Sequence, residues 1–239
     1  MTPLEKKSTL EEIRERFDHD VERFSNLETG QQATIDAPLV LELVAKTCAG
    51  HLRPGNTLLD LGCGAGNFTL RVLQDSPGLN CHLVDLSQPM LTRAGERLRQ
   101  STAASIATHQ SDLRALAFEP TTFDVILAGA VLHHLRDDDD WRSAFTHFHR
   151  WLKPGGRLYV ADLCTFDIPG VQDIMWKRYG DYLASYGGET GRDKVFAYID
   201  REDSPRPLPF QLDLLRATGF SAHDVLHRTS VFACYVGVK

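Results

Sequence analysis

Apolar residues in this chain fall into short runs separated by longer stretches of mixed polarity. Five runs of five to seven residues, bounded by turn residues, have the length and composition of strands. They cover residues 57–61, 79–85, 105–109, 123–128 and 157–163. The run at 123–128 (FDVILA) is apolar almost throughout, which suits a central strand of a parallel sheet.

Segments with helical spacing of apolar residues separate these strands. Three helices are predicted: one at 67–74, one that begins after Ser87 as its N-cap, and one at 140–152. The acidic run 137–140 suits the positive N-terminal end of the third helix. Residues 153–156 (KPGG) are expected to turn before the fifth strand. Strands that alternate with helical crossovers predict a parallel sheet with helices on both faces.

The C-terminal part adds a helix and two more strands. A helix at 210–218 is closed by Gly219 in the position after the C-cap. Two runs, 222–227 and 231–238, flank a short turn and predict an antiparallel hairpin at the sheet edge. We therefore predict an α/β fold: a doubly wound, Rossmann-like sheet of seven mostly parallel strands with an antiparallel last strand.

Two helical regions lie outside this alternation. Near the N-terminus, apolar residues at helical spacing predict a helix over 10–24, and Asp36 followed by Pro38 marks the start of another that runs to Gly50. The segment 165–209 is too long for a plain connection, so a helical cap over the site is expected there. The predicted division is 1–52 as N-terminal helices packing on the core, 53–164 as the ligand-binding α/β core, 165–209 as a helical cap over the substrate, and 210–239 as the C-terminal helix and β-hairpin that complete the core.

Composition narrows the function classes. The net charge of −6 disfavours broad nucleic-acid binding, which needs positive charge. No apolar run reaches the length of a membrane span, and the charged N-terminus lacks the apolar core of a signal peptide. Five scattered cysteines without a C-x-x-C pair indicate reduced thiols. We expect a cytoplasmic protein acting on a small molecule; a homodimer is compatible with the sequence.

The strongest local signal is a glycine-rich loop between the first strand and the next helix, LLDLGCGAGNFTL. Its glycines permit positive φ and close approach of a ligand, at the carboxyl end of a strand where doubly wound sheets bind ligands. A dinucleotide fingerprint would place glycine where this chain has Asn67. Asp60 would also repel a pyrophosphate, whereas it suits a ligand that carries an ammonium and a sulfonium.

With these motifs the chain resembles the class I methyltransferases that depend on S-adenosylmethionine (SAM), over roughly residues 56–239. Residues 60–66 are similar to the family's first motif, and Asp85, at the end of the second strand, matches the acid that accepts the ribose hydroxyls. Asp112 matches the acid that accepts the adenine amino group. The resemblance implies SAM as cofactor, with S-adenosylhomocysteine as product. The implied cofactor-binding residues are Asp60, Gly62, Cys63, Gly64, Gly66, Asp85, Leu86, Asp112, Leu113 and Gly129.

Candidate catalytic residues follow the fourth strand. His133 and His134 lie where acceptor and cofactor would meet, and either could act as a base. Asp162, at the end of the fifth strand, could cap a helix or face the substrate. In the cap, Arg192, Arg201 and Tyr179 are candidates for substrate binding, since guanidinium groups suit a carboxylate or phosphate. We expect no metal site, because His147 and His149 point to different faces of one helix.

Other functions remain open at this stage. The chain also resembles, more distantly, the carboxy-S-adenosylmethionine synthases, through an early Phe17-Asp18, the helical insert and the C-terminal hairpin. A carboxylate-binding arginine of that group does not align cleanly, although Arg192 and Arg201 lie near it. A non-catalytic SAM-binding subunit is the alternative from another class, and a dehydrogenase is disfavoured by Asp60 and Asn67.

Overall fold

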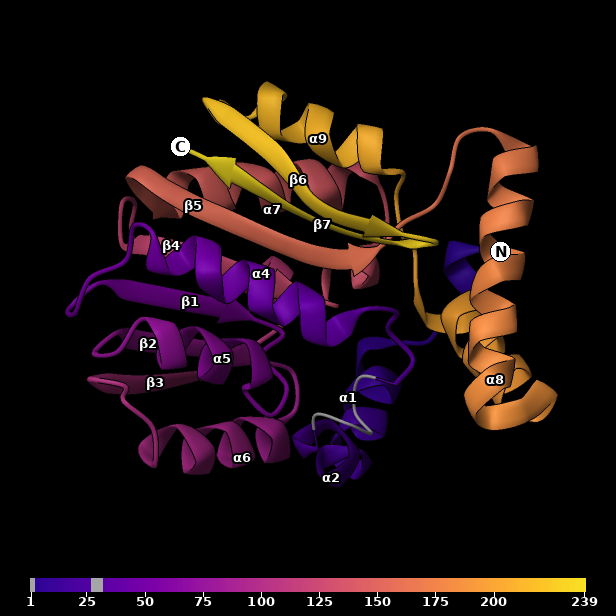
Figure 1. Cartoon of the computed structure of the whole chain (residues 1–239), viewed down its shortest axis with the longest axis horizontal. Coiled ribbons are helices and arrows are strands. Elements are labelled where there is room, and N and C mark those ends of the chain that lie inside the picture. The colour runs from indigo at the N-terminus through magenta and orange to yellow at the C-terminus, as the bar shows by residue number, and fades with distance from the viewer. Residues whose placement is uncertain (1–2, 27–31) are drawn as a thin grey trace.

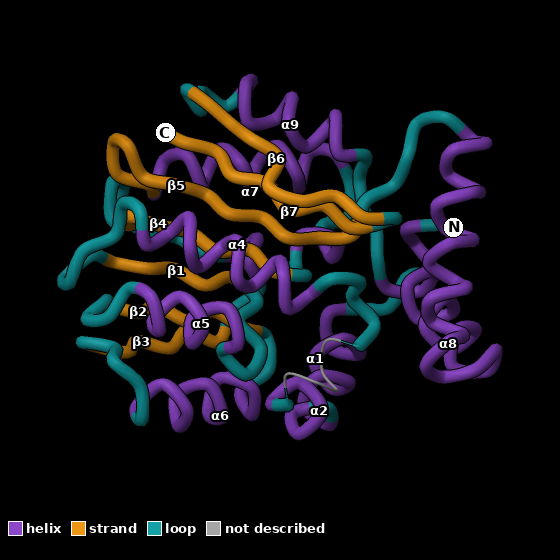
Figure 2. Tube along the Cα trace, in the orientation of Figure 1, coloured by secondary structure: helices purple, strands orange, loops and turns teal. Residues whose placement is uncertain are grey.

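The computed structural model describes residues 3–26 and 32–239. Within these ranges seven strands form one sheet in the order β3-β2-β1-β4-β5-β7-β6 (Figures 1 and 2). Strands β1 to β5 pair in parallel, whereas β7 runs antiparallel to both β5 and β6. The predicted fold class is therefore confirmed. The strands are β1 Thr57–Leu61, β2 Asn80–Asp85, β3 Ser105–Gln110, β4 Phe123–Gly129, β5 Leu152–Leu163, β6 Ala222–Thr229 and β7 Phe232–Val238.

Helices cover both faces of the sheet because side chains alternate between the faces. Leu58 packs with α4 (Ala37–Ala49), α5 (Asn67–Asp75) and α6 (Gln88–Arg99), whereas Leu59 packs with α7 (Asp138–Trp151) and α9 (Leu208–Ala217). The two layers are visible in Figure 1. The described residues also include three short 3₁₀ turns: η1 Leu4–Lys6, η2 Leu113–Ala115 and η3 Leu132–His134. The N-terminal helix α4 belongs to one of the two layers that cover the sheet.

Several predicted helix ends are present in the structure. The Ser87 hydroxyl accepts from the Met90 N–H at the start of α6, and the Asp137 carboxylate caps α7. Gly219 takes a φ of +99° just after the last residues of α9. These signals are local, so the sequence alone carries them.

Other boundaries differ from the prediction. The expected helix over 10–24 is two helices, α1 Leu10–His19 and α2 Val21–Ser25, separated by Asp20. Asp36 precedes α4 but its side chain makes no cap; the carboxylate lies 3.0 Å from Nε2 of His227. β5 begins at Leu152 rather than 157, since Leu152 already pairs with Phe123.

The insert is helical, as predicted, and folds back on itself. α8 (Pro169–Glu202) is interrupted at Gly188, where φ is +65° and ψ −175°. The second half packs on the first, with the Phe196 ring 5.8 Å from both Trp176 and Tyr179. Tyr186, by contrast, is 64% exposed. Figure 1 shows α8 beyond the carboxyl ends of the strands, on the same side as α1 and α2.

No helix in the described part of the chain combines the length and apolar character needed to cross a membrane. The five cysteines are all buried with free thiols.

Candidate active site

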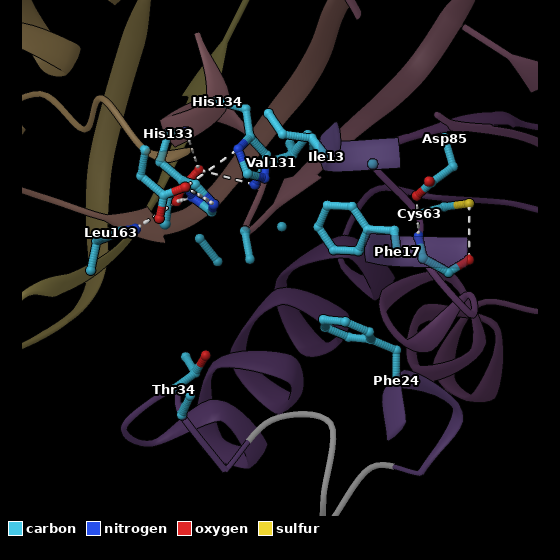
Figure 3. A pocket seen from close by; sticks show the side chains of 18 of the residues that line it. Ile13, Phe17, Phe24, Thr34, Cys63, Asp85, Val131, His133, His134 and Leu163 are labelled. Atoms are coloured by element: carbon cyan, nitrogen blue, oxygen red, sulfur yellow. Dashed lines mark hydrogen bonds and ion pairs between the residues drawn. The ribbon is translucent and has the colours of Figure 1, made fainter. Parts of the chain in front are cut away.

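A cavity of about 620 Å³ opens at the carboxyl ends of the central strands. The loops after β1, β2, β3 and β4 and the end of β5 line one side of it, and residues of α1, α2 and α8 line the other. Figure 3 draws Asp85 and Cys63 at one end and His133 and His134 at the other. We call these the glycine-loop end and the histidine end. This is the crevice in which doubly wound sheets bind ligands.

The glycine loop has the backbone that the sequence predicts. Gly62, Gly64 and Gly66 all have positive φ, at +61°, +50° and +83°. A Cβ on Gly62 would meet Val131 Cγ2 at 2.4 Å, so only glycine brings the loop this close to the strand-four loop. A Cβ on Gly64 would meet nothing within 4 Å, which leaves open space beside the backbone.

Asp85 anchors this loop from the end of β2. Its Oδ2 accepts the Gly64 N–H at 2.8 Å and its Oδ1 accepts the Ser87 N–H at 2.9 Å. Burial raises the pKa of Asp85 to about 6 against the lowering effect of these hydrogen bonds. Each carboxylate oxygen has two lone pairs, so the group retains acceptor capacity toward the cavity.

Asp60 is the second buried carboxylate at the glycine-loop end. It is 1% exposed and accepts a hydrogen bond from the Thr69 hydroxyl at 2.6 Å. Burial raises the pKa of Asp60 to about 7, with Asp85 adding to the rise. A cation bound in the cavity would favour the ionised form of both carboxylates, which matches a sulfonium and an ammonium ligand.

Asp112 lies at the cavity but is already engaged. Its carboxylate receives the Arg114 guanidinium, with Nε at 3.0 Å and Nη2 at 2.6 Å from Oδ2, and it caps η2 through the Arg114 N–H. Sequence reasoning did not foresee this pair. An adenine amino group would have to share the carboxylate with Arg114, which a four-lone-pair acceptor permits.

Nine of the ten predicted cofactor-binding residues line the cavity: Asp60, Gly62, Cys63, Gly64, Asp85, Leu86, Asp112, Leu113 and Gly129. Gly66 is not among the lining residues. It stands at the N-cap of α5, where its missing Cβ lets Leu98 and Ala94 of α6 approach closely. Gly129 lines the floor for a similar reason, since a Cβ there would meet the Phe68 ring at 2.4 Å. The roles of these residues toward a ligand remain predictions.

At the histidine end, Asp162 holds η3 and His133 together. Its Oδ2 accepts the backbone N–H groups of Val131, Leu132 and His133, at 3.2, 2.7 and 3.3 Å. Its Oδ1 lies 2.5 Å from Nδ1 of His133. Asp162 therefore caps a turn, which was one of its two predicted roles, and also orients an imidazole.

The two histidines have opposite electrostatic environments. Burial favours the neutral ring of His133, but the carboxylates of Asp162 and Asp203 outweigh it and raise its pKa to about 9. Burial and the neighbouring His133 lower the pKa of His134 well below its ordinary value. The ring centroids lie 4.3 Å apart. A simple general-base role for His133 at neutral pH is thus not favoured in the ligand-free protein.

Asp203 reaches this end from the residue after α8, and the sequence analysis gave it no role at the site. It is 1% exposed, and burial raises its pKa to about 7. Next to it, Glu202 forms a bidentate pair with Arg16, with Nη2 2.7 Å from Oε2. Nothing in the local sequence marks these two acids, because the folded-back insert brings them to the site.

The three predicted substrate-binding residues differ in their position relative to the cavity. Tyr179 lines the cavity, and its hydroxyl donates to the Ala33 carbonyl. Arg192 does not line it, because its guanidinium pairs with Asp193 at 2.8 Å on the surface. Arg201 is exposed and also lies outside the lining residues. Neither arginine is among the residues that line the cavity, and a role of either one in binding the acceptor remains a prediction.

The N-terminal helices cover the cavity, which was not predicted. Phe17 and Phe24 line it, with ring centroids 5.6 Å apart. Asn67, the residue that breaks the dinucleotide fingerprint, donates to the Phe24 carbonyl and accepts from Arg97. Glycine at this position would lose both bonds, so Asn67 connects the glycine loop to the helices above it.

His147 and His149, the two histidines of one helix that were considered as metal ligands, each pack against an aromatic ring. His147 stacks on Trp151, and His149 packs edge-on against Phe220. A different group gathers at the histidine end, formed by His133, His134 and Asp203.

Comparison with known proteins agrees with this fold and cavity. A family model described as a methyltransferase domain matches residues 58–156. Over 237 residues the chain is 27% identical to the demethylmenaquinone methyltransferase of Symbiobacterium thermophilum, covering 95% of this chain and 92% of that protein. The ubiquinone/menaquinone biosynthesis C-methyltransferase of Cereibacter sphaeroides is 30% identical over 175 residues, with 70% and 67% covered. The carboxy-S-adenosyl-L-methionine synthase of Shewanella amazonensis is 27% identical over 204 residues, with 84% and 83% covered.

Solved structures show the same fold. Phosphoethanolamine N-methyltransferase 2 of Haemonchus contortus, in complex with phosphomonomethylethanolamine and S-adenosylhomocysteine, superposes with a TM-score of 0.64 at 19% identity. The match covers 91% of this chain and 46% of that one. The CurJ carbon methyltransferase gives 0.65 at 19% identity, with 89% and 58% covered.

The sheet and its cavity define a Rossmann-like α/β protein with a ligand-sized cavity at the carboxyl ends of its parallel strands. The chain belongs to the class I SAM-dependent methyltransferases. SAM is its cofactor, and the donor set at the glycine-loop end fits that molecule: two buried carboxylates, Asp60 and Asp85, lie beside a backbone loop without side-chain bulk. The dehydrogenase and the non-catalytic subunit are thereby set aside.

Proposed function

We propose that the chain transfers the methyl group of SAM to a small, largely apolar acceptor that carries an oxygen, such as a hydroxylated aromatic ring. The observation that supports this most is the second half of the cavity. Beyond the glycine-loop end it is walled by Ile13, Phe17 and Phe24 and finishes at the polar group around His133. Such a chamber fits a flat apolar molecule with one polar edge.

The cofactor would occupy the glycine-loop end. We propose that Asp85 accepts the ribose hydroxyls, Asp112 the adenine amino group, and that the backbone at Gly62–Gly64 faces the methionine part. SAM supplies a methyl carbon already activated by a sulfonium leaving group. What remains for this chain is to align the acceptor, exclude water and interact with the acceptor's oxygen.

The aromatic walls of the cavity would exclude water from the reacting groups. Phe17 and Phe24 come from α1 and α2, which the Asn67 bond to the Phe24 carbonyl ties to the glycine loop. Their rings would cover the reacting groups. We propose that His133 and His134 meet the polar edge of the acceptor, with His133 oriented by Asp162.

The relatives support an aromatic acceptor of the quinone kind. The relative from Symbiobacterium, aligned over nearly the whole chain, is named for methylation of demethylmenaquinone. In the acceptor region this chain supplies the matching chemistry, namely aromatic walls and a polar end. We therefore expect a hydroxylated naphthalene or quinol ring rather than a nucleic acid.

A second candidate is a carboxy-SAM synthase-like activity, favoured by the similarity to the Shewanella enzyme. The geometry of the cavity supports this activity less well than methyl transfer to an apolar acceptor. Arg192 and Arg201 lie outside the cavity lining, and the guanidinium of Arg16, which lines it, is already paired with Glu202. An acceptor or co-substrate with a carboxylate would thus lack an unpaired guanidinium from any of these three.

The test is a product assay by mass spectrometry with SAM and a panel containing a 1,4-naphthoquinol, a catechol and phosphoethanolamine. We expect S-adenosylhomocysteine together with a methylated ring compound, and a raised KM for the ring compound in Phe17→Ala. Val225→Ala, exposed on β6, is the matched control and should leave KM unchanged. Methylation of phosphoethanolamine alone would contradict the proposal, and a carboxylated SAM derivative would favour the second candidate.

A further inference from the structure

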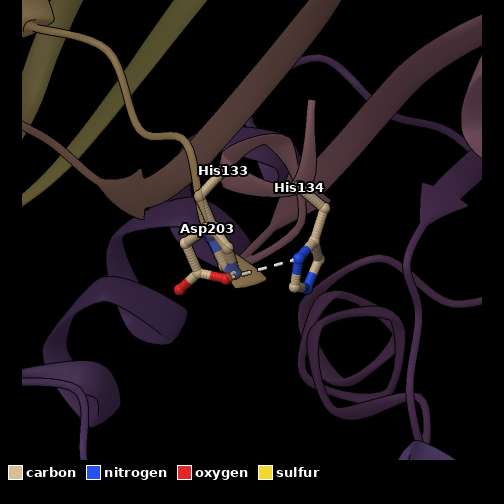
Figure 4. A group of neighbouring side chains, drawn as sticks. All are labelled: His133, His134 and Asp203. Atoms are coloured by element: carbon tan, nitrogen blue, oxygen red, sulfur yellow. Dashed lines mark ion pairs between the residues drawn. The ribbon is translucent and has the colours of Figure 1, made fainter. Parts of the chain in front are cut away.

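Three metal-ligand side chains converge at the histidine end of the cavity. His133 and His134 come from η3, after β4, whereas Asp203 follows α8, about seventy positions later. Oδ1 of Asp203 lies 3.4 Å from Nδ1 of His134 and 3.8 Å from Nε2 of His133. All three ligand atoms lie within 4.8 Å of one another (Figure 4).

Two of these three ligand atoms, Nδ1 of His134 and Oδ1 of Asp203, are buried without hydrogen-bond partners. Among the described residues, both ring nitrogens of His134 and Oδ1 of Asp203 have none, although each of these atoms is inaccessible to solvent. The Asp203 side chain is 1% exposed. Buried polar groups are normally paired, and an unsatisfied one needs an explanation such as an ion. Here two of the unsatisfied atoms, Nδ1 of His134 and Oδ1 of Asp203, lie 3.4 Å from each other.

The orientation of His133 is typical of a metal ligand. A metal-bound imidazole usually donates its other ring N–H to a carboxylate, which fixes the tautomer and the ring direction. Asp162 takes this role through Oδ1, 2.5 Å from Nδ1 of His133. Three backbone N–H groups in turn hold Asp162 in place. Nε2 of His133 is consequently left to face Asp203 and His134.

The charge on Asp203 is available at this point. Within the described chain, only the two histidines come within ion-pair distance of its carboxylate. The nearby cations are engaged elsewhere: Arg16 pairs with Glu202, Arg136 donates to the Glu202 carbonyl, and Lys7 donates to the Asp203 carbonyl. None of these bonds reaches the Asp203 carboxylate.

We propose that Nε2 of His133, Nδ1 of His134 and Oδ1 of Asp203 bind a divalent transition-metal ion. Two imidazoles and one carboxylate suit Zn²⁺ or Fe²⁺ rather than Mg²⁺ or Ca²⁺, which prefer oxygen. Donors at Zn²⁺ distances in a tetrahedron lie about 3.3 Å apart. The 3.4 Å separation matches this, whereas the 3.8 Å separation and the one between the two imidazole nitrogens, which is within 4.8 Å, would have to shorten when the ion binds.

Three protein ligands leave a coordination position open, as in catalytic metal sites. It faces the cavity, whose lining includes all three residues. An acceptor oxygen bound there would be polarised and brought beside the cofactor. The site does not depend on which acceptor is used. It replaces the expectation of no metal, which considered His133 and His134 only together with His147 and His149 and did not include Asp203.

The experiment is metal binding by the full chain after treatment with a chelator. Calorimetry with Zn²⁺ should give one ion per chain, and Co²⁺ should give the d–d absorption of a site with nitrogen ligands. Asp203→Asn and His134→Gln should each weaken Zn²⁺ binding by more than about 100-fold, because even outer-shell partners change affinity 10- to 100-fold. His109→Asn is the control. Nε2 of His109 lies 3.1 Å from Nδ1 of His82, so these two residues form another pair of imidazoles that could take up zinc nonspecifically.

SAM calorimetry on each variant checks folding, because none of the mutated residues lies at the glycine-loop end. The proposal is overturned if the wild-type chain takes up no Zn²⁺ or Co²⁺, or if Asp203→Asn and His134→Gln, folded and binding SAM, keep wild-type metal affinity. It is also overturned if His109→Asn removes the bound ion. This outcome is separate from the acceptor assay, since metal affinity is measured without any acceptor.

Discussion

Oδ1 of Asp162 lies 2.5 Å from Nδ1 of His133, while Oδ2 of the same carboxylate accepts three backbone N–H groups of the turn that carries the histidine. One buried acid thus fixes both the direction of the ring and the shape of the loop after β4.

Asp162→Asn should therefore affect stability and turnover together. The amide nitrogen cannot accept a hydrogen bond, so either His133 or the turn loses an acceptor, and a buried polar group left unpaired costs about 1–3 kcal/mol. We expect the free energy of unfolding, measured with urea, to fall by this amount and the rate of methyl transfer to fall with it. SAM affinity should not change. Asp224→Asn, exposed on β6, is the control; unchanged turnover in Asp162→Asn would show that the His133 orientation does not matter.

Asp85→Ala should weaken SAM binding by about 2 kcal/mol, or roughly 30-fold in Kd, the order expected for charge-assisted hydrogen bonds. The variant also leaves the N–H groups of Gly64 and Ser87 without their acceptor, so its thermal stability must be recorded alongside. Calorimetry with SAM measures the effect. Wild-type affinity in a folded variant would count against the ribose assignment.

Asp60 predicts a specific pH dependence of stability. Its pKa in the folded protein is about 7, above the ordinary value of 3.8, so the folded state binds more protons than the unfolded state between these values. Stability from this group is thus greatest below about pH 4 and is lost as pH rises toward 7. Urea unfolding of the ligand-free protein at pH 5, 6, 7 and 8 should show a smaller decline in Asp60→Asn than in wild type. If stability declined with pH equally in Asp60→Asn and in wild type, the raised pKa of the buried Asp60 carboxyl would be contradicted.

SAM binding should depend on pH in the opposite direction. Asp60 and Asp85 must be ionised to interact with a cationic ligand, and their pKa values are about 7 and 6. We expect SAM affinity to increase from pH 5 to pH 8 and to level off above that range. Affinity that is constant over this range would mean that neither carboxylate interacts with the ligand's charge.

Gly62 and Gly64 allow a matched comparison of strain and steric conflict. Alanine at either site must adopt positive φ, which costs about 1–2 kcal/mol. Only at Gly62 would the new Cβ also collide with Val131, whereas at Gly64 it meets open space. Urea unfolding without ligand should therefore show a clearly larger loss for Gly62→Ala. Equal losses would argue against the close contact between the two loops.

The parts of this structure that could be predicted are those encoded locally. Glycine positions, Ser87 and the apolar runs act within a few residues. They therefore predict the mostly parallel sheet, the glycine-rich loop and the place of Asp85 at the end of the second strand. Asp203 could not be found in this way, because a helix that folds back at Gly188 carries it to the histidine end. The same is true of Phe17, whose helical spacing indicated a buried face but not that this face lines the cavity.

Arg192 shows how little residue type alone says about position. A guanidinium in the insert suited an acidic acceptor by its chemistry, yet its neighbours Asp193 and Glu189 already pair with it on the surface. Residue type indicates what a side chain can bind, while the fold of the insert decides whether it faces the cavity.

The most direct test of the account is a crystal structure with S-adenosylhomocysteine. We predict the ribose hydroxyls within about 3 Å of the Asp85 carboxylate, the amino-acid part along Gly62–Gly64, and the sulfur facing the histidine end. A nucleoside bound away from Asp85, or with its sulfur turned from His133 and His134, would contradict the assignment of both ends of the cavity.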